Sequence, residues 1–293
     1  MKNSLLSTKG LKKVYGKRDT VFEALKGIDI DIEKGETVAI IGKSGSGKST
    51  LMHLLALLDK PSEGEINLNG QNTSQLKNHK LNRLRNKEFG FVFQSFFMNA
   101  NDSVLNNVIL PLKIAGVGRR ERKRRAMEAL KVVELDDKYK NKAKDLSGGQ
   151  KQRVCIARAI VNNPKVIFAD EPTGNLDPET SWGIVSLLEE INNFGTTILV
   201  TTHDEKIVNQ LKKRVITIRD GKVIGDQKCD GHYDLDASHT RIVKHPLAVT
   251  IRTTPTTEQI RRATTSQPTP KPAPKSAAAT ERPKRTPRRR FIN

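Results

Sequence analysis

Short apolar runs recur along the chain, separated by polar segments, and they predict the buried strands of a sheet. Each run has strand length and is rich in β-branched or aromatic residues; the runs occupy residues 37–41, 89–93, 166–169 and 197–202. Helical spacing follows the first run, because Leu51, Leu54, Leu55 and Leu58 recur at i, i+3, i+4 and i+7. Strands that alternate with helices predict an α/β fold.

Other segments predict hairpins around this core. Further strands are expected at residues 9–15, 24–32, 65–68, 214–218 and 223–224. The first two are expected to pair, because the second mixes period-two alternation with β-branched residues. Asn69–Gly70 and Asp220–Gly221 are turn dipeptides that mark two hairpins. Residues 71–88 are polar and basic and predict a surface helix.

Residues 95–145 differ from the rest, with helical spacing and charged runs. Their apolar face holds Ala126, Met127, Leu130 and Val133, which predicts a helical insertion reaching from about residue 95 to residue 160. We interpret the run Arg119–Arg125 as a solvated helix face. A nucleic-acid patch is the alternative, but the run lacks the interleaved aromatic residues that stack on bases.

Charge divides the 293 residues into a body, residues 1–237, and a tail, residues 238–293. The tail holds 13 of the 52 Lys and Arg, 2 of the 32 acidic residues and 8 of the 13 prolines, so it carries about half of the net charge of +20. We expect it to be disordered, because it cannot bury enough apolar surface to offset the entropy of ordering. It can act as a solvated extension or bind anionic lipid headgroups, where each cation contributes ~1 kcal/mol; nucleic acid is the least favoured target.

The chain is expected to be cytosolic. No apolar run approaches the roughly 18 residues that span a bilayer, and the first ten residues lack the apolar segment of a signal peptide. The two cysteines, Cys155 and Cys229, form neither a metal-ligand spacing nor a disulfide framework, which agrees with a reducing compartment. We interpret Cys155 as a helix-packing residue rather than a reactive thiol.

The first candidate site is the glycine-rich segment that follows the first buried run. It fits the P-loop pattern G-x-x-x-x-G-K-[ST] and consists of Gly42, Lys43, Ser44, Gly45, Ser46, Gly47, Lys48, Ser49 and Thr50. Glycines allow successive backbone N–H groups to converge on a phosphate. Lys48 adds a mobile positive charge, and the Ser49 hydroxyl suits a Mg²⁺ ligand. A flexible Gly/Ser turn is the alternative, but the strand before it and the helix after it favour phosphate binding.

A second candidate anion site follows the helical insertion, at Leu146-Ser-Gly-Gly-Gln150. Ser147 is a good N-cap, and Gly148 and Gly149 allow a phosphate to approach the first turn of the helix that follows. One nucleotide does not need two phosphate cradles roughly a hundred residues apart. We therefore expect Ser147, Gly148, Gly149 and Gln150 of one subunit to face the P-loop of a second copy.

Carboxylates follow the third buried run, where Asp170 and Glu171 come directly after an apolar strand. Asp170 can hold the Mg²⁺ shell and Glu171 can accept a proton from an attacking water, as in other nucleotide hydrolases. His203 follows the last run and is a candidate to contact the γ-phosphate, with a packed or solvated histidine as the alternative.

Two more residues each allow two interpretations. Tyr15, at the end of the first predicted strand, is either a half-buried strand residue or a platform for an adenine ring, where stacking contributes ~1–3 kcal/mol. Gln94 directly follows an aromatic strand and, taken alone, is either a solvated loop residue or part of the site.

Together, these motifs resemble the ATP-binding subunits of ABC complexes. Over residues 5–228, the P-loop, Gln94, LSGGQ, Asp170–Glu171, Asp177 and His203 occur in the family's order and at similar spacings. The nearest resemblance is to the MacB, LolD and FtsE type. Phe89–Gln94 looks like the macrolide and lipoprotein exporters, whereas Asp177–Ser181 is similar to the cell-division member FtsE. Asn107 departs from the export pattern, where a glutamate is usual.

The resemblance implies a P-loop NTPase (RecA-like) core with an antiparallel β subdomain and a helical subdomain. It implies that two copies bind two Mg·ATP head to tail, each nucleotide lying between the P-loop of one copy and LSGGQ of the other. By the same resemblance, Glu171 polarises the attacking water, and His203 and Gln94 sense the γ-phosphate. The family also implies that Gln94 joins Ser49 and Asp170 around Mg²⁺, that Tyr15 stacks on adenine and that Asp177 belongs to the nucleotide site.

The resemblance also implies a separate integral-membrane permease of the MacB, LolE or FtsX type, which would hold the chain at the inner face of the membrane. A cytoplasmic helix of that partner would dock beside Gln94, around Ser95–Gly118, with Phe96–Met98 as a contact or as core packing. The implied function is ATP-driven export or extrusion of a hydrophobic cargo or lipoprotein. An FtsE-like regulator of cell-wall hydrolysis is the alternative. A soluble ATPase acting on DNA or ribosomes is disfavoured by the short helical insertion and the single ATPase domain.

Overall fold

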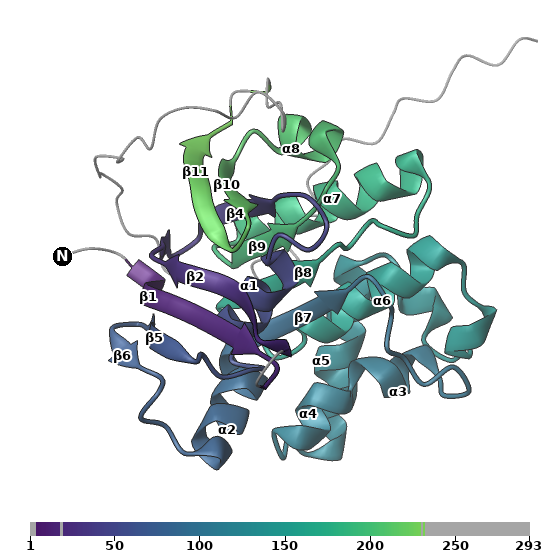
Figure 1. The fold of residues 1–293 in the computed structure, drawn as a ribbon. Coiled ribbons are helices and arrows are strands. Elements are labelled where there is room, and N and C mark those ends of the chain that lie inside the picture. The colour runs from purple at the N-terminus through teal and green to yellow at the C-terminus, as the bar shows by residue number, and fades with distance from the viewer. Residues whose placement is uncertain (1–3, 18–19, 230, 232–293) are drawn as a thin grey trace, which may run out of the picture.

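The computed structural model describes residues 4–17, 20–229 and 231; the predicted disordered tail, residues 238–293, lies outside them. A six-stranded sheet forms the centre of the molecule, in the order β11-β10-β4-β9-β8-β7 (Figure 1). Its strands are β4 (Thr37–Ile41), β7 (Phe89–Phe93), β8 (Val166–Asp170), β9 (Thr197–Thr201), β10 (Arg214–Arg219) and β11 (Lys222–Lys228). All neighbours are parallel except β10 and β11. The four apolar runs thus form adjacent buried strands, as predicted.

An antiparallel sheet accompanies the central one, in the order β2-β1-β5-β6 with β3 also paired to β1. Its strands are β1 (Ser4–Tyr15), β2 (Phe22–Ile28), β3 (Asp31–Glu33), β5 (Glu63–Leu68) and β6 (Gln71–Asn72). The prediction of one continuous strand over residues 24–32 is wrong. At residues 29–30, between the end of β2 and the start of β3, side-chain hydrogen bonds interrupt the regular pairing with β1. The Asp29 carboxylate accepts from the Gly10 N–H at 2.5 Å, and the Thr8 hydroxyl accepts from the Ile30 N–H at 3.1 Å.

The helices lie between and beside the strands. They are α1 (Lys48–Leu55), α2 (Asn78–Glu88), α3 (Val104–Val108), α4 (Leu110–Ile114), α5 (Arg119–Val132), α6 (Gly148–Ile160), α7 (Pro178–Asn193) and α8 (Glu205–Leu211), with 3₁₀ turns at Asp136–Lys138 and Ala143–Asp145. The helix predicted from residue 71 begins only at Asn78. Asn69 and Gly70 have φ angles of 49° and 77° and turn the chain back, so that the next two residues pair with β5.

Alternation along the strands of the central sheet divides the core into two clusters. Val38, Ile40 and Leu199 face α1 and the antiparallel sheet, whereas Ala39 and Ile41 face the other side. That second side is covered by α3–α8. Since successive strand residues point to opposite faces, a sheet covered on both faces requires continuous apolar strands, as this sequence has.

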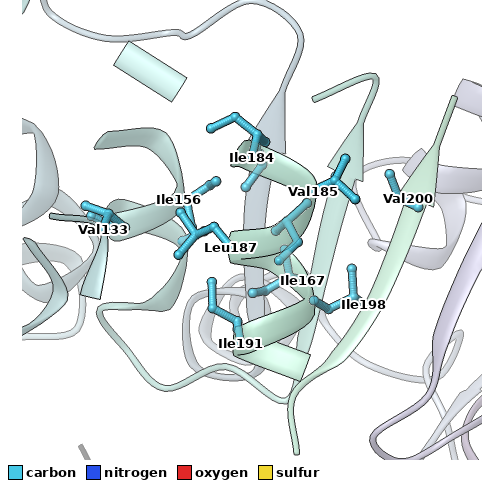
Figure 2. Packing of buried hydrophobic residues seen from close by; sticks show 14 of the residues in the cluster. Val133, Ile156, Ile167, Ile184, Val185, Leu187, Ile191, Ile198 and Val200 are labelled. Carbon is cyan, nitrogen blue, oxygen red and sulfur yellow. The ribbon is translucent and has the colours of Figure 1, made fainter. Parts of the chain in front are cut away.

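Helix α7 fills the centre of the larger cluster. Figure 2 shows its apolar residues against the sheet and α6; the labelled residues are Val133, Ile156, Ile167, Ile184, Val185, Leu187, Ile191, Ile198 and Val200. Helix α6 packs closely on β7, because Gly90 has no side chain: a Cβ there would lie 2.6 Å from the carbonyl oxygen of Ala159. This packing fixes the position of the α6 N-terminus relative to the sheet.

Helices α3–α6 connect β7 to β8 and form the helical segment that the sequence predicted. Arg124 and Arg125 of α5 pair with Glu121, and Arg124 also with Glu128, on the solvent side of the helix. The charged run is therefore a solvated helix face, as expected. Within the described parts of the chain, no helix has both the length and the apolar character needed to cross a membrane.

Candidate functional site

Four parallel strands end side by side at one edge of the central sheet. β4 leads into residues 42–50, β7 into Gln94, β8 into Glu171 and β9 into the turn that holds His203. The residues aligned across this edge are Ile40 with Thr201, Thr201 with Asp170, and Asp170 with Phe93. The carboxyl ends of parallel strands are the usual ligand sites of α/β proteins. The structure therefore brings four of the predicted motifs to one edge.

Residues 42–50 form a tight loop that leads directly into α1. Gly42 has a φ of 153°, and a Cβ there would lie 2.2 Å from the carbonyl oxygen of Ile218. Gly47 has a φ of 109°, and its Cβ would lie 2.8 Å from the carbonyl oxygen of Ala24. Both positions require glycine. A Cβ there would collide with backbone atoms, and the positive φ would be strained for a residue with a side chain. Glycine at these two positions therefore lets the loop turn tightly into the N-terminus of α1.

Lys48 and Ser46 give this loop the character of an anion site. The Lys48 side chain is buried and donates to the carbonyl oxygens of Gly42 at 2.8 Å and Lys43 at 3.1 Å. No carboxylate pairs with this ammonium among the residues that the structure describes. The Ser46 hydroxyl is buried without a hydrogen-bond partner. A buried ammonium bonded to neutral carbonyl groups, together with a buried hydroxyl that has no partner, suits the binding of a phosphate at a helix N-terminus.

Thr201 bonds to both acidic residues at the end of β8. Its buried hydroxyl donates to the Asp170 carboxylate at 2.5 Å and accepts from the Glu171 N–H at 2.9 Å. Glu171 has a φ of 45°, in the left-handed region that a glutamate rarely adopts. These contacts fix the Asp170 carboxylate and the Glu171 backbone at the end of β8. Such strain concentrates at functional sites.

His203 and Gln94 lie on either side of this carboxylate pair. His203 Nδ1 lies 3.4 Å from a Glu171 carboxylate oxygen, and the His203 side chain is 66% exposed. The Gln94 side chain lies against Gly174, where a Cβ would come within 2.7 Å of its amide nitrogen. The Gly174 N–H in turn donates to the Glu171 carbonyl at 3.1 Å. His203 therefore lies beside the Glu171 carboxylate, and Gln94 beside the turn that follows Glu171.

LSGGQ lies at the N-terminus of α6. Ser147 is the N-cap that the sequence predicted, and Gln150 completes a capping box with it. A Cβ on Gly149 would lie 2.4 Å from the Thr180 methyl group. Gln152 of α6 donates to the carbonyl oxygens of Phe93 at 3.3 Å and Pro172 at 2.7 Å, so the N-terminal part of α6 lies beside the end of β7. Within the sheet, β7 is three strand spacings, about 14 Å, from β4, the strand that carries the P-loop.

Asp177 lies beside LSGGQ rather than beside the P-loop. It is the N-cap of α7 and accepts from the Thr180 N–H at 2.9 Å. The hydrogen bonds from Thr180 hold the pKa of the Asp177 carboxyl below its usual value. The structure therefore places the N-termini of α6 and α7 next to each other, close to the ends of β7 and β8.

Tyr15 reaches the P-loop helix from the other sheet. It ends β1, is 40% exposed, and donates through its hydroxyl to the Asp59 carboxylate at 3.1 Å. Burial raises the pKa of the Tyr15 phenol, a hydrogen bond with the Thr50 side chain opposes that rise, and Asp59 adds to it. Tyr15 thus lies beside Thr50, the last residue of the glycine-rich segment, and is partly exposed.

The donor set at the strand ends fits Mg²⁺ bound together with phosphate. The described residues contain no cluster of three or more His, Cys, Asp or Glu side chains that could hold a metal ion by themselves. Mg²⁺ in nucleotide sites needs only one or two side-chain oxygens besides phosphate and water. Ser49 is exposed at the start of α1, and Asp170, whose Oδ1 accepts from Thr201, is half-buried.

Sequence reasoning missed Thr201 and Asp59. Thr201 lies inside an apolar strand, and only the register between β8 and β9 shows that it faces the carboxylates. Asp59 follows α1, and only the pairing of β1 with β5 brings it to Tyr15. The single available signal is a polar residue at the carboxyl end of a buried strand, which applies to Thr201 alone.

Comparisons with known proteins agree with this geometry. The family model described as ABC transporter matches residues 25–174. The cell-division ATP-binding protein FtsE of Bacillus subtilis is 43% identical over 226 residues, which cover 76% of this chain and 99% of that protein. The chain belongs to the ABC transporter family. It is an ABC ATPase cassette, and the resemblance and the fold class predicted from the sequence are confirmed.

Two further matches are a longer relative and a solved structure. The macrolide export ATP-binding/permease protein MacB of Bdellovibrio bacteriovorus is 46% identical over 224 residues, 76% of this chain. The cassette spans about a third of that relative, 34% of its length. Among solved structures, the dimeric post-hydrolysis state of the ATP-binding cassette MJ0796 with ADP and Pi is 39% identical, has a TM-score of 0.71, and is covered over 100% of its length by 78% of this chain.

Proposed function

We propose that this cassette hydrolyses ATP as a pair of copies that share two nucleotides, and that the pair drives a separate membrane permease. The observation that carries the proposal is the division of the motifs. The P-loop follows β4, at one end of the row of four parallel strands, whereas Ser147–Gln150 begin α6, which lies beside the end of β7 at the other end of that row. A single chain thus presents two half-sites in different places.

In this proposal the P-loop edge of one copy binds the phosphates and the α6 N-terminus of the other copy covers them. Residues 42–50 supply backbone N–H groups and the Lys48 ammonium, and Tyr15 stacks on adenine. Ser49, Asp170 and Gln94 would hold Mg²⁺, which neutralises charge on the transferred phosphate. The dimeric MJ0796 cassette bound to ADP and Pi supports the pairing.

Proton transfer is assigned to Glu171. Its carboxylate would accept a proton from a water aligned with the γ-phosphate, while His203, 3.4 Å from that carboxylate, would contact the same phosphate. Thr201 would keep the Asp170 carboxylate toward the metal position and the Glu171 backbone in its strained conformation.

Two variants of the full chain test these assignments. Glu171→Gln should lower the hydrolysis rate by roughly 10²–10⁴-fold, the usual contribution of a general base, and leave ATP affinity intact. Lys48→Ala should instead abolish measurable ATP binding, because a buried positive charge is removed from the phosphate site. Parental turnover in the first variant, or parental affinity in the second, would refute the respective role.

The permease is proposed to dock on the helical side, around Ser95–Gly118. Apolar side chains lie uncovered there: Phe97 is 71% exposed, Leu110 49% and Ile114 70%. Met98 packs against the core, which supports the core-packing alternative for that residue. Several exposed apolar residues in one segment are typical of a binding surface. By similarity to MacB-type and FtsE-type proteins, the partner would be a permease of the MacB, LolE or FtsX class.

Co-purification tests this surface with the permease encoded beside the gene. Phe97→Glu/Ile114→Glu should lose the permease from detergent extracts, while Trp182→Glu, an exposed apolar residue on α7, should keep it. Retention by the double variant would refute the assignment. The same pull-down with and without residues 238–293, together with co-sedimentation on anionic liposomes, tests whether the basic tail holds the cassette at the membrane.

Regulation of cell-wall hydrolysis is the alternative function. The relative named FtsE is covered over 99% of its length, which favours a cassette-sized subunit with a separate partner. Deletion of the gene decides between the two roles: a division defect favours the FtsE-like role, and altered export of a hydrophobic cargo or lipoprotein favours the other.

A further inference from the structure

Tyr15 is the only part of the proposed nucleotide site that comes from the antiparallel sheet, and its ring is held by two charged neighbours. The Lys13 ammonium lies over one face of the ring, 4.9 Å from the centroid. The Asp59 carboxylate accepts from the Tyr15 hydroxyl at 3.1 Å and pairs with the same ammonium at 2.8 Å. Three side chains therefore contact one another in a closed triangle.

This triangle is built into the fold. Lys13 also donates to the Lys60 carbonyl at 2.7 Å, and its side chain is only 12% exposed. Ser62 binds the backbone of β1 at two points. Its N–H donates to the Lys12 carbonyl at 2.9 Å, and its hydroxyl accepts from the Val14 N–H at 3.0 Å. The segment after α1 is thus fastened to the end of β1.

Hydrogen bonds from its neighbours keep the Asp59 carboxyl ionised. Burial alone would raise the pKa of its carboxyl, but hydrogen bonds from Lys13, the Lys60 N–H and Tyr15 outweigh that effect and lower the pKa. The carboxylate therefore stays ionised at neutral pH. It can both anchor the Tyr15 hydroxyl and hold the Lys13 ammonium against the ring.

We infer that Asp59 and Lys13 are positioning residues for the base of the nucleotide. Lys13 covers one face of the Tyr15 ring, so that the base stacks on the other face, and Asp59 fixes both side chains. The segment that carries Asp59 directly continues α1, whose first residue, Lys48, lies in the phosphate site. Helix α1 therefore sets the distance between Lys48, which anchors the phosphates, and Tyr15, on which the base stacks. This inference rests on the proposed role of Tyr15.

The chain offers a matched control one residue away. Lys12 pairs with Glu63 at 2.7 Å, so that a second lysine of β1 is bonded to an acid of the same connecting region. That pair does not touch Tyr15, and both partners are more exposed than Lys13. Glu63→Gln therefore removes a carboxylate charge near the same strand without altering the ring.

The test measures the affinity of full-length protein in the Glu171→Gln background for ATP and for inorganic triphosphate, which has no base. Asp59→Asn and Lys13→Met should each weaken ATP by about 3- to 10-fold, within the range of coupling between contacting residues. Both should leave triphosphate affinity within about two-fold, and Glu63→Gln should change neither. In a Tyr15→Ala background, Asp59→Asn should have no further effect.

The outcomes distinguish a failure of the proposed Tyr15 platform from a failure of the positioning role of Asp59. Unchanged ATP affinity in Tyr15→Ala refutes the proposed platform itself. A weakened Tyr15→Ala with an unaffected Asp59→Asn refutes only the positioning role. Equal loss of ATP and triphosphate binding in Asp59→Asn, or the same loss with Tyr15 absent, shows that Asp59 acts on the fold rather than through the ring and overturns the inference.

Discussion

Replacing Thr201 by Val tests whether the hydroxyl beneath the carboxylates positions them. Valine keeps the shape of the side chain and removes one bond to a charged acceptor, Asp170 at 2.5 Å, and one from the Glu171 N–H at 2.9 Å. The Glu171 N–H keeps a second acceptor, the Thr201 carbonyl at 3.2 Å. A hydrogen bond to a charged group contributes about 1.5–3 kcal/mol. We therefore expect the free energy of unfolding to fall by about 2 kcal/mol and the melting temperature by about 4–8 °C.

Activity should fall by more than the loss of stability explains. Groups that orient the ligands of a metal typically change activity or metal affinity by about 10- to 100-fold. We expect this range for Mg²⁺-dependent ATP hydrolysis by the folded variant, with a raised Mg²⁺ requirement. The assays are thermal unfolding and steady-state hydrolysis across a Mg²⁺ titration, both at a temperature where the variant is fully folded.

The same strand supplies the control. Thr197, at the other end of β9, is equally buried; its hydroxyl accepts from the Gly35 N–H at 2.8 Å and donates to the Glu33 carbonyl at 3.5 Å. Thr197→Val should lower the melting temperature and leave hydrolysis unchanged, because it lies away from the carboxyl ends of the strands. Parental Mg²⁺-dependent activity in Thr201→Val, or an equal loss in both variants, would refute the reasoning.

Three further predictions concern other parts of the cassette. Ile184→Ala, in the cluster of Figure 2, should lower the free energy of unfolding by about 2–5 kcal/mol in a denaturant titration, whereas the exposed Glu190→Ala should change it by less than about 0.5 kcal/mol; similar values for both would contradict the packing. Burial raises the pKa of the Cys155 thiol to about 11, so iodoacetamide should label Cys155 at mildly alkaline pH only as fast as the protein unfolds, and rapid labelling by peptide mass spectrometry would overturn this. The Asp177 pKa is lowered on folding, so its stabilising effect is present above the ordinary carboxyl pKa of about 4 and is lost as the pH falls through the lowered value; Asp177→Asn should keep the cap and remove this pH dependence of the melting temperature.

The central sheet could be predicted because its strands are buried on both faces. Such strands are continuous apolar runs, and the predictions at residues 37–41 and 89–93 match β4 and β7 in both bounds. Elements set by long-range contacts could not be predicted. The division of residues 24–32 depends on bonds from Thr8 and Asp29 that join distant parts of the chain, and α8 is too short to give a periodic signal.

The candidate site follows the same division. Ser147 as a helix N-cap and Cys155 as a buried packing residue follow from local sequence, and the structure confirms both. Thr201 reaches Asp170 only through the register of β8 and β9, and Asp59 reaches Tyr15 only through the second sheet. Local chemistry therefore identified the motifs, whereas the residues that hold them in place required the fold.

The pairing of two half-sites is tested most directly by the mass of the Glu171→Gln protein in solution with Mg·ATP. The account predicts a dimer of about 65 kDa, twice the chain mass of 32.7 kDa, that depends on ATP. Adding Ser147→Asp keeps an N-cap but places a negative charge against the shared phosphate, and should leave monomers, whereas Ser147→Asn, of the same size and also a good cap, should keep the dimer. A protein that binds ATP and stays monomeric, or a Ser147→Asp variant that dimerises as well as its parent, would contradict the account.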